Sequence, residues 1–249
     1  MYLQISSRTD YARNENIVKD SLSQFELEMR KATIARTKGY FNVSKQLFLE
    51  ILKNYPKDIE KHRSGMIYGN LGVISFDLGD YDESIEYFEQ AIEIFGSDPA
   101  FSRFELQCNI LIIISLVELN KVDEAYAVYN AKVKDFEITT KVLKHYCGIA
   151  EAVLLQTNKS LASLTQAKNI LDDIINDEVL DYEASSDAVC YLSNILLEIY
   201  EMTHVSSILD EVENHAKILF EWGKSQEMNQ YMVDGSMILA KLERIKLLK

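Results

Sequence analysis

Residues 65–96 read GMIYGNLGVISFDLGDYDESIEYFEQAIEIFG. Small residues stand at Gly72, Ser84 and Ala91, where they let two helices touch. Larger apolar side chains fill the space beside them: Tyr68, Leu71, Tyr81 and Phe88. A glycine inside a helix costs about 1 kcal/mol relative to alanine, so Gly72 indicates the close approach of a second helix. The stretch therefore predicts a helical hairpin.

Such a hairpin cannot bury its apolar face alone, so it predicts similar neighbours stacked into a solenoid. The pattern recurs about 41 residues later and about 40 residues earlier. The later copy holds Leu119, Val122, Ala125 and Tyr129, and the earlier copy holds Gly39, Phe41, Ser44 and Phe48. Ala167 and Leu171 mark a weaker fourth copy, and Tyr231 and Gly235 repeat the spacing of Tyr68 and Gly72 in a final helix.

We expect residues 1–249 to form a single all-α domain, a right-handed superhelix (α-solenoid) of antiparallel helical hairpins with about 11 helices. Residues 1–14 are expected to be disordered. The predicted hairpins lie near 15–56, 60–96, 99–136, 138–176 and 180–221, followed by a final helix at 226–249. Asp98 before Pro99 predicts a helix start, and Pro56 predicts the end of the first hairpin.

The composition fits long helices joined by short turns, with two prolines and nine glycines. The longest apolar run, Ile110 to Leu119, is shorter than the roughly 20 residues that span a bilayer, so it predicts a buried helix. Met1 to Asp10 holds no secretory signal pattern. We expect a cytoplasmic protein with no membrane partner.

The charge is uneven along the chain. The net charge is −13, with +4 on residues 1–64 and −17 on the remainder. An acidic body repels phosphate backbones, so it disfavours nucleic acid as a partner and favours a partner with a basic surface. The alternative is that the acidic residues only solvate the outer helix faces.

Motifs for chemistry are missing from the sequence. Cys108, Cys147 and Cys190 form no CxxC pair, and the four histidines form no HExxH motif, so no metal site is predicted. His145 and Cys147 point about 200° apart on a helix, which separates them as a base and a nucleophile. The carboxylates from Asp172 to Glu178 are read as a solvated helix end. We expect no enzyme activity and no cofactor.

The spacing from Tyr68 to Gly96 resembles the tetratricopeptide repeat (TPR) family. Its 40 to 42 residue period exceeds the family's usual 34 and is similar to kinesin light chains, bacterial peptide-pheromone receptors and maltose-type transcription activators. The resemblance implies that first helices of the hairpins line a concave groove for peptides or partner helices. By position, the groove residues would be Arg30, Thr33, Arg36, Asn70, Val73, Phe76, Asp77, Ile110, Ile114 and Glu118.

Not every groove position needs to bind. Packing between repeats is the alternative for each groove residue, and it is the favoured explanation for Val73, Ile110 and Ile114. The family's clamp for C-terminal carboxylates needs Lys and Asn at positions where this chain has Gly69 and Val73, then Ile110 and Ile114. We do not expect that specificity.

The resulting hypothesis is a protein or peptide binding scaffold that uses the concave groove. The alternative is a sensor or regulatory segment of a larger signalling or transcription-regulating protein. A helical enzyme or small-molecule binder is a third reading, and a homo-oligomer formed through the apolar C-terminal helix is a fourth.

Overall fold

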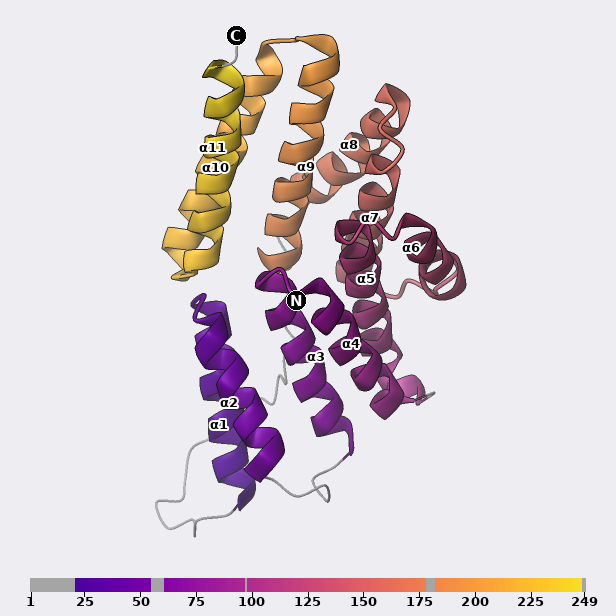
Figure 1. The fold of residues 1–249 in the computed structure, drawn as a ribbon, viewed down its shortest axis with the longest axis vertical. Helices are drawn as coiled ribbons and strands as arrows, with labels where there is room; N and C mark the ends of the chain where they lie inside the picture. Colours follow the sequence, from indigo (N-terminus) through magenta and orange to yellow (C-terminus); the bar gives the residue numbers. More distant parts are fainter. Residues whose placement is uncertain (1–20, 55–60, 97, 178–181, 248–249) are drawn as a thin grey trace. The chain divides into compact units, whose positions relative to one another are not determined.

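The computed structural model describes residues 21–54, 61–96, 98–177 and 182–247. These residues form eleven α-helices and two short helical turns, and the described part contains no strand (Figure 1). The predicted all-α class with about 11 helices in hairpins is confirmed. The superhelical course stays a prediction, and the expectations for residues 1–14 and for Pro56 lie outside the described residues.

The chain divides into two compact units, residues 1–108 and 109–249. The first holds α1 (Ser21–Thr37), α2 (Phe41–Asn54), α3 (Lys61–Asp77) and α4 (Tyr81–Phe95), then the 3-10 turn η1 (Pro99–Phe101). Helix α1 packs on α2, and α3 packs on α4. The buried core joins both hairpins through Phe25, Phe48, Leu71 and Ile74. Asp98 directly precedes Pro99, and its side chain accepts a hydrogen bond from the Ala100 N–H. The predicted helix start at this position is confirmed.

The α3–α4 hairpin is held by the close contact that Gly72 predicts. A Cβ atom added at Gly72 would lie 2.6 Å from Cε1 of Phe88, closer than side chains allow. The Ser84 hydroxyl donates a hydrogen bond to the Gly72 carbonyl over 2.9 Å. In the α1–α2 hairpin, Ser44 donates to the Ala32 carbonyl over 2.7 Å. The two hairpins therefore share one packing device.

The turns repeat with the same period. Gly39, Gly79 and Asn120 all have positive φ, at 80°, 80° and 58°. After each one, an amide donates back into the preceding helix: Tyr40 to Ala35, Asp80 to Ser75, and Lys121 to Leu116. This left-handed helix end satisfies carbonyls that the helix itself leaves open. Its recurrence at 40 and then 41 residues gives the repeat a backbone basis.

Polar contacts join successive hairpins of the first unit. Arg63 of α3 donates to Glu26 of α1 over 2.8 Å, and its guanidinium lies 5.1 Å from the Phe25 ring centroid. Lys45 of α2 forms an ion pair with Glu83 of α4, and Ser75 of α3 donates to the same carboxylate. Burial raises the pKa of Glu83, but the hydrogen bonds from Lys45 and Ser75 outweigh it and lower that pKa.

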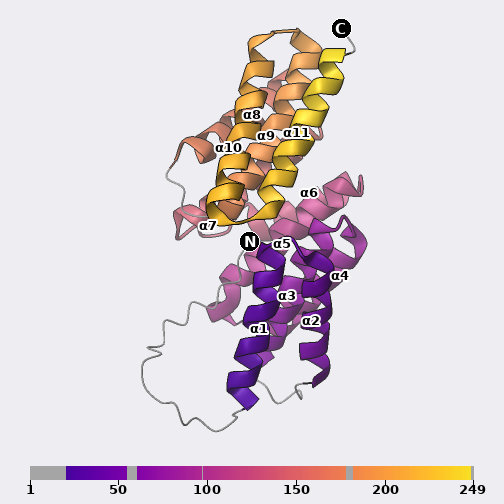
Figure 2. The same ribbon diagram turned by 90° about the vertical axis from the view of Figure 1, so that its left-hand side faces the viewer.

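The second unit contains the remaining helices. They are α6 (Val122–Val128), the π-helical turn η2 (Tyr129–Val133), α7 (Lys141–Gln156), α8 (Leu161–Asn176), α9 (Tyr182–Thr203), α10 (Ser207–Gln226) and α11 (Asn229–Leu247). Helix α7 packs on α8, and α10 packs on α11. Figure 2 shows α10 and α11 side by side. Helix α9 contacts α7, α8, α10 and α11, so it is the centre of this unit.

Helix α5 (Ser102–Glu118) contains the unit boundary. Together with η1 it forms a 20-residue stretch, Pro99–Glu118, with mean hydropathy 1.5, which is long and apolar enough to cross a membrane. In this structure 61% of the most apolar 18-residue part of that segment is buried. Core helices of soluble proteins have the same length and composition, so the segment is weak support for a membrane span.

Candidate functional site

The predicted groove residues of α1 and α3 fall into an exposed set and a buried set. Arg30 and Asp77 are exposed, and Thr33 and Phe76 are half-buried. Arg36, Asn70 and Val73 are buried. Desolvation of its carboxyl group raises the pKa of Asp77, and the nearby guanidinium of Arg36, itself buried, partly offsets this rise.

Two polar members of this set are already hydrogen-bonded within their own helices. The Thr33 hydroxyl donates to the Met29 carbonyl over 2.9 Å, and the Asn70 amide donates to the Met66 carbonyl over 2.8 Å. The Phe76 ring packs edge-on against Tyr81 at 5.5 Å between centroids. A ligand on this face would therefore meet chiefly Arg30, Phe76 and Asp77.

The predicted residues of α5 are different in character. Ile110 and Ile114 are 1% and 3% exposed, so both pack in the interior. Glu118, the last residue of α5, is exposed and interacts electrostatically with Lys241 of α11. Within α5, only Glu118 of the predicted set stands where a partner could reach it.

A cavity of about 330 Å³ lies in the second unit, between α7, α8 and the segment from η2 to residue 138. Its apolar lining comes from Val133, Ile138, Ile170 and Ile174. Its charged and polar lining comes from Tyr129, Lys134, Lys144, His145, Glu151, Asp173 and Asp177. A volume of this size is typical of small-ligand sites.

Side-chain caps fix where α7 and α8 begin. Thr140 precedes α7 and accepts a hydrogen bond from the Leu143 N–H over 3.3 Å. Ser160 precedes α8 and accepts from the Ser163 N–H over 3.2 Å. Such caps satisfy amides that have no partner within the helix, and each stabilises its helix by about 1 kcal/mol. The two helices therefore have defined starting points on either side of the cavity.

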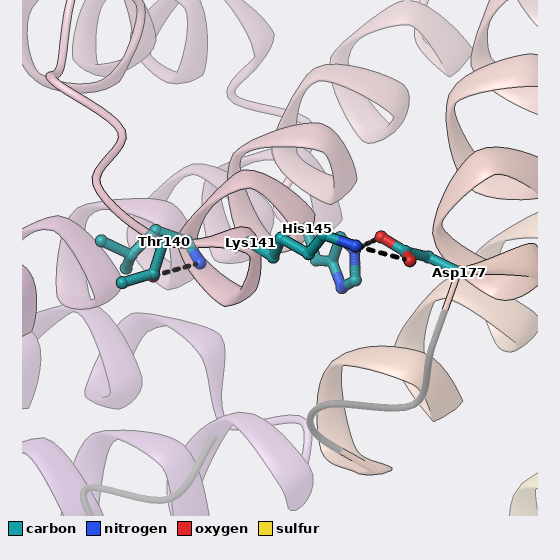
Figure 3. A network of polar contacts seen from close by, with 5 residues as sticks. Thr140, Lys141, His145 and Asp177 are labelled. Atoms are coloured by element: carbon teal, nitrogen blue, oxygen red, sulfur yellow. Dashed lines mark hydrogen bonds and ion pairs between the residues drawn. The ribbon is translucent and has the colours of Figure 1, made fainter.

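An ion-pair cluster includes two residues of the cavity lining, His145 and Asp177 (Figure 3). Lys141 Nζ lies 3.0 Å from Asp177 Oδ1, and His145 Nε2 lies 3.3 Å from Asp177 Oδ2. Asp177 directly follows α8, so the cluster joins the end of α8 to the beginning of α7. The sequence pattern predicts that Asp172 and Asp177 belong to a solvated helix end. Instead, Asp177 pairs with Lys141 and His145, and Asp172 pairs with Lys168.

The opposite wall includes a π-helical turn. Over Tyr129–Val133 the helix widens, and the Lys134 N–H donates to the Tyr129 carbonyl, five residues back, over 2.9 Å. π-Helical turns are rare and are frequent at functional sites. This turn brings Tyr129, Val133 and Lys134 to the cavity. Apolar periodicity does not reveal it, because the turn adds only one residue to a helical repeat.

The cysteine thiols are poorly suited to nucleophilic chemistry. All three are free. Burial, with a smaller contribution from Glu151, raises the pKa of Cys147 to about 11, and burial raises that of Cys108 to about 12. The pKa of Cys190 is raised further by burial and by Asp234. The His145 ring contacts Asp177 through its Nε2 atom. Over the described ranges, no group of three or more His, Cys, Asp or Glu side chains is placed to hold a metal ion.

Comparison with known proteins gives one family and one fold. The tetratricopeptide repeat family matches residues 66–98, which correspond to α3 and α4. Among solved structures, the Rap conjugation gene regulator of plasmid pLS20, in complex with the Phr* peptide, is similar with a TM-score of 0.57 and 15% sequence identity. The similarity covers 98% of this chain and 81% of the regulator. No curated protein sequence matches the chain.

The family match falls on the hairpin where Gly72, Ser84 and Phe88 make the close contact, and the structural similarity extends over the flanking hairpins. Residues 66–98 therefore match one tetratricopeptide repeat, and the chain as a whole has an all-α, TPR-like fold.

Proposed function

We propose that the chain is a binding module for a peptide or an extended segment of a protein partner, with no chemistry of its own. The observation that carries the proposal is the match of residues 66–98 to the tetratricopeptide repeat, together with the likeness of the chain to a regulator solved with a peptide. In such repeats the first helices of the hairpins present the binding face, which here means α1 and α3 in the first unit.

The exposed part of that face suits an extended chain. Phe76 offers an aromatic surface for an apolar side chain, and Arg30 and Asp77 offer one charge of each sign for the flanking polar groups. The net charge of −13 favours ligands with basic residues. A basic peptide would meet Asp77 directly and would also be attracted by the field of the acidic body.

A peptide-responsive regulator is the second candidate. It is favoured by the similar structure, which is that of a gene regulator bound to a peptide. In that case ligand binding to this chain would change its affinity for a second protein. Self-association is a further prediction, and Val233 and Met237 of α11 are apolar and exposed where a second copy could pack.

A peptide array tests the binding proposal. The full chain is labelled and incubated with an array of random pentapeptides, and the strongest hits are measured again by fluorescence anisotropy. We expect micromolar binding of basic, apolar-containing peptides that the double variant Phe76→Ala/Asp77→Asn weakens at least about tenfold. Glu86→Gln/Glu93→Gln is the matched control, because both glutamates are exposed on α4. Equal binding by wild type and the Phe76/Asp77 variant would rule out this face.

A further inference from the structure

The cavity of the second unit has an apolar floor between two charged ends. Gly148 of α7 lies against the floor, where an added Cβ would be 3.2 Å from both Ile170 and Ile174 of α8. Val133 and Ile174 are buried, whereas Ile138 at the rim is 47% exposed. The exposed side chain of Ile138 therefore offers apolar surface at the rim of the cavity that a ligand could cover.

The charges along α7 are separated by the length of two helical turns. Lys144 and Glu151 both line the cavity and are seven residues apart, which corresponds to about 10 Å along the helix axis. His145 and Asp177 lie at the Lys144 end. Glu151 lies near Tyr129. Burial raises the pKa of Tyr129, and the negative charge of Glu151 raises it further. Lys144 and Glu151 therefore place one charge of each sign along α7.

Lys144 is exposed and Glu151 is half-buried, and both are available to a ligand as far as the described residues show. Within the described residues, neither Lys144 nor Glu151 forms an ion pair or a side-chain hydrogen bond. The same holds for Lys134 and Asp173, which add one charge of each sign to the lining. Asp177, in contrast, is already paired with Lys141 and His145. A half-buried charge such as that of Glu151 is stabilised when a ligand of opposite charge approaches it.

We propose that this cavity binds a small zwitterion the size of a tripeptide. Its ammonium group pairs with Glu151, its carboxylate pairs with Lys144, and its apolar side chain rests on Ile170, Ile174 and Val133. Three extended residues span about 10 Å, which matches the separation of the two charges along α7. A purely apolar ligand would leave both charges unpaired, and a single-sign ion would satisfy only one of them.

This site is separate from the proposed peptide-binding face. The face belongs to α1 and α3 in the first unit, whereas every cavity residue belongs to the second unit. The two proposals can therefore fail independently. A chain without binding at Phe76 and Asp77 can still bind the zwitterion at Glu151 and Lys144.

Isothermal titration calorimetry of the full chain with alanyl-leucyl-alanine tests the proposal. Saturable binding is expected for the tripeptide with free termini, with Kd raised at least about tenfold by N-acetylation, by C-amidation, by Glu151→Gln and by Lys144→Gln. Glu124→Gln and Lys53→Gln are matched controls at exposed positions that do not line the cavity, and they should leave Kd unchanged. Phe76→Ala/Asp77→Asn should also leave it unchanged.

Alkylation of Cys147 locates the bound tripeptide, because its thiol lines the cavity and is half-buried. At pH 9, the tripeptide should slow iodoacetamide modification of Cys147 at least about fivefold and leave Cys190 unaffected, as measured by peptide mass spectrometry. Absence of saturable heat would overturn the proposal. So would tripeptide binding that ignores both the Glu151 and Lys144 substitutions.

Discussion

Ser84 donates its hydroxyl hydrogen to the Gly72 carbonyl over 2.9 Å, across the α3–α4 hairpin. Ser44 makes the equivalent bond to the Ala32 carbonyl over 2.7 Å. In both hairpins the acceptor lies 12 residues before the serine. Both serines are fully buried, so neither hydroxyl could turn to water instead. In the next hairpin along the chain, Ala125 stands at the serine position and the bond is missing. The bond is therefore a feature of the first two hairpins.

Replacing Ser84 by alanine should lower the free energy of unfolding by about 1 kcal/mol, because the Gly72 carbonyl loses a buried donor while the packing volume hardly changes. Ser44→Ala should have a similar effect. Ser236→Ala is the control, since its hydroxyl is exposed and bonds only within its own helix. Urea denaturation followed by circular dichroism measures all three. A loss equal to that of Ser236→Ala would mean that the two buried bonds contribute nothing.

Gly72→Ala should destabilise the protein by about 1–3 kcal/mol, although alanine favours a helix over glycine by about 1 kcal/mol. The added methyl would lie 2.6 Å from Phe88, whose ring is completely buried and has no room to move. Gly72→Leu should lower the melting temperature further.

A double-mutant cycle separates this clash from other effects of the substitution. Phe88→Leu alone should destabilise by creating space, but combined with Gly72→Ala it should recover part of the loss. Additive losses in the double variant, or a melting temperature unchanged by Gly72→Leu, would contradict the close-contact explanation for this glycine.

His215 should make stability depend on pH. It is buried in α10, and its Nδ1 lies 3.1 Å from the Ser193 hydroxyl oxygen. Burial lowers the pKa of His215 in the folded protein. In the unfolded chain the pKa is the ordinary histidine value of about 6.5, so below that pH the unfolded chain binds a proton more readily than the folded chain. The contribution of His215 is fully present above pH 6.5 and is lost as the pH falls through the lowered folded pKa.

Urea denaturation from pH 8 to pH 5 should therefore show a smaller pH-dependent loss of stability in His215→Gln than in wild type. The variant will be less stable at pH 8, because it also loses packing and the contact with Ser193. His204→Asn is the control, since His204 is exposed and asparagine tolerates its positive φ. Parallel stability curves for wild type and His215→Gln would refute the assignment.

Much of the fold could be predicted because the residues that pack the α3–α4 hairpin lie close together in the sequence. Gly72, Ser84 and Phe88 are within 16 residues of one another. Ser84 and Phe88 recur 40 residues earlier as Ser44 and Phe48, with Ala32 at the position of Gly72. The turn positions Gly39 and Gly79 also follow this period. Asn120 keeps the same turn without a glycine, because asparagine is among the residues that tolerate positive φ.

The cavity could not be predicted in the same way. Its lining comes from three segments, and the π-helical turn at Tyr129–Val133 disturbs the regular period where it matters. The polar pairs between hairpins, such as Arg63 with Glu26 and Gln156 with Glu198, are separated by 37 and 42 residues. These separations are close to the repeat period, but many charged residues share that spacing and only the fold selects the partners. For the groove residues, the apolar run from Ile110 to Leu119 already favoured packing for Ile110 and Ile114, and both are buried.

Hydrogen–deuterium exchange with a peptide from the array is the most direct test of the central claim, that the first helices bind the ligand. The account predicts slower exchange in α1 (Ser21–Thr37) and α3 (Lys61–Asp77) on adding the peptide, with the outer helix α4 (Tyr81–Phe95) unchanged. The protection should vanish in Phe76→Ala/Asp77→Asn. Protection confined to α2 and α4, or the same protection in that variant as in wild type, would contradict it.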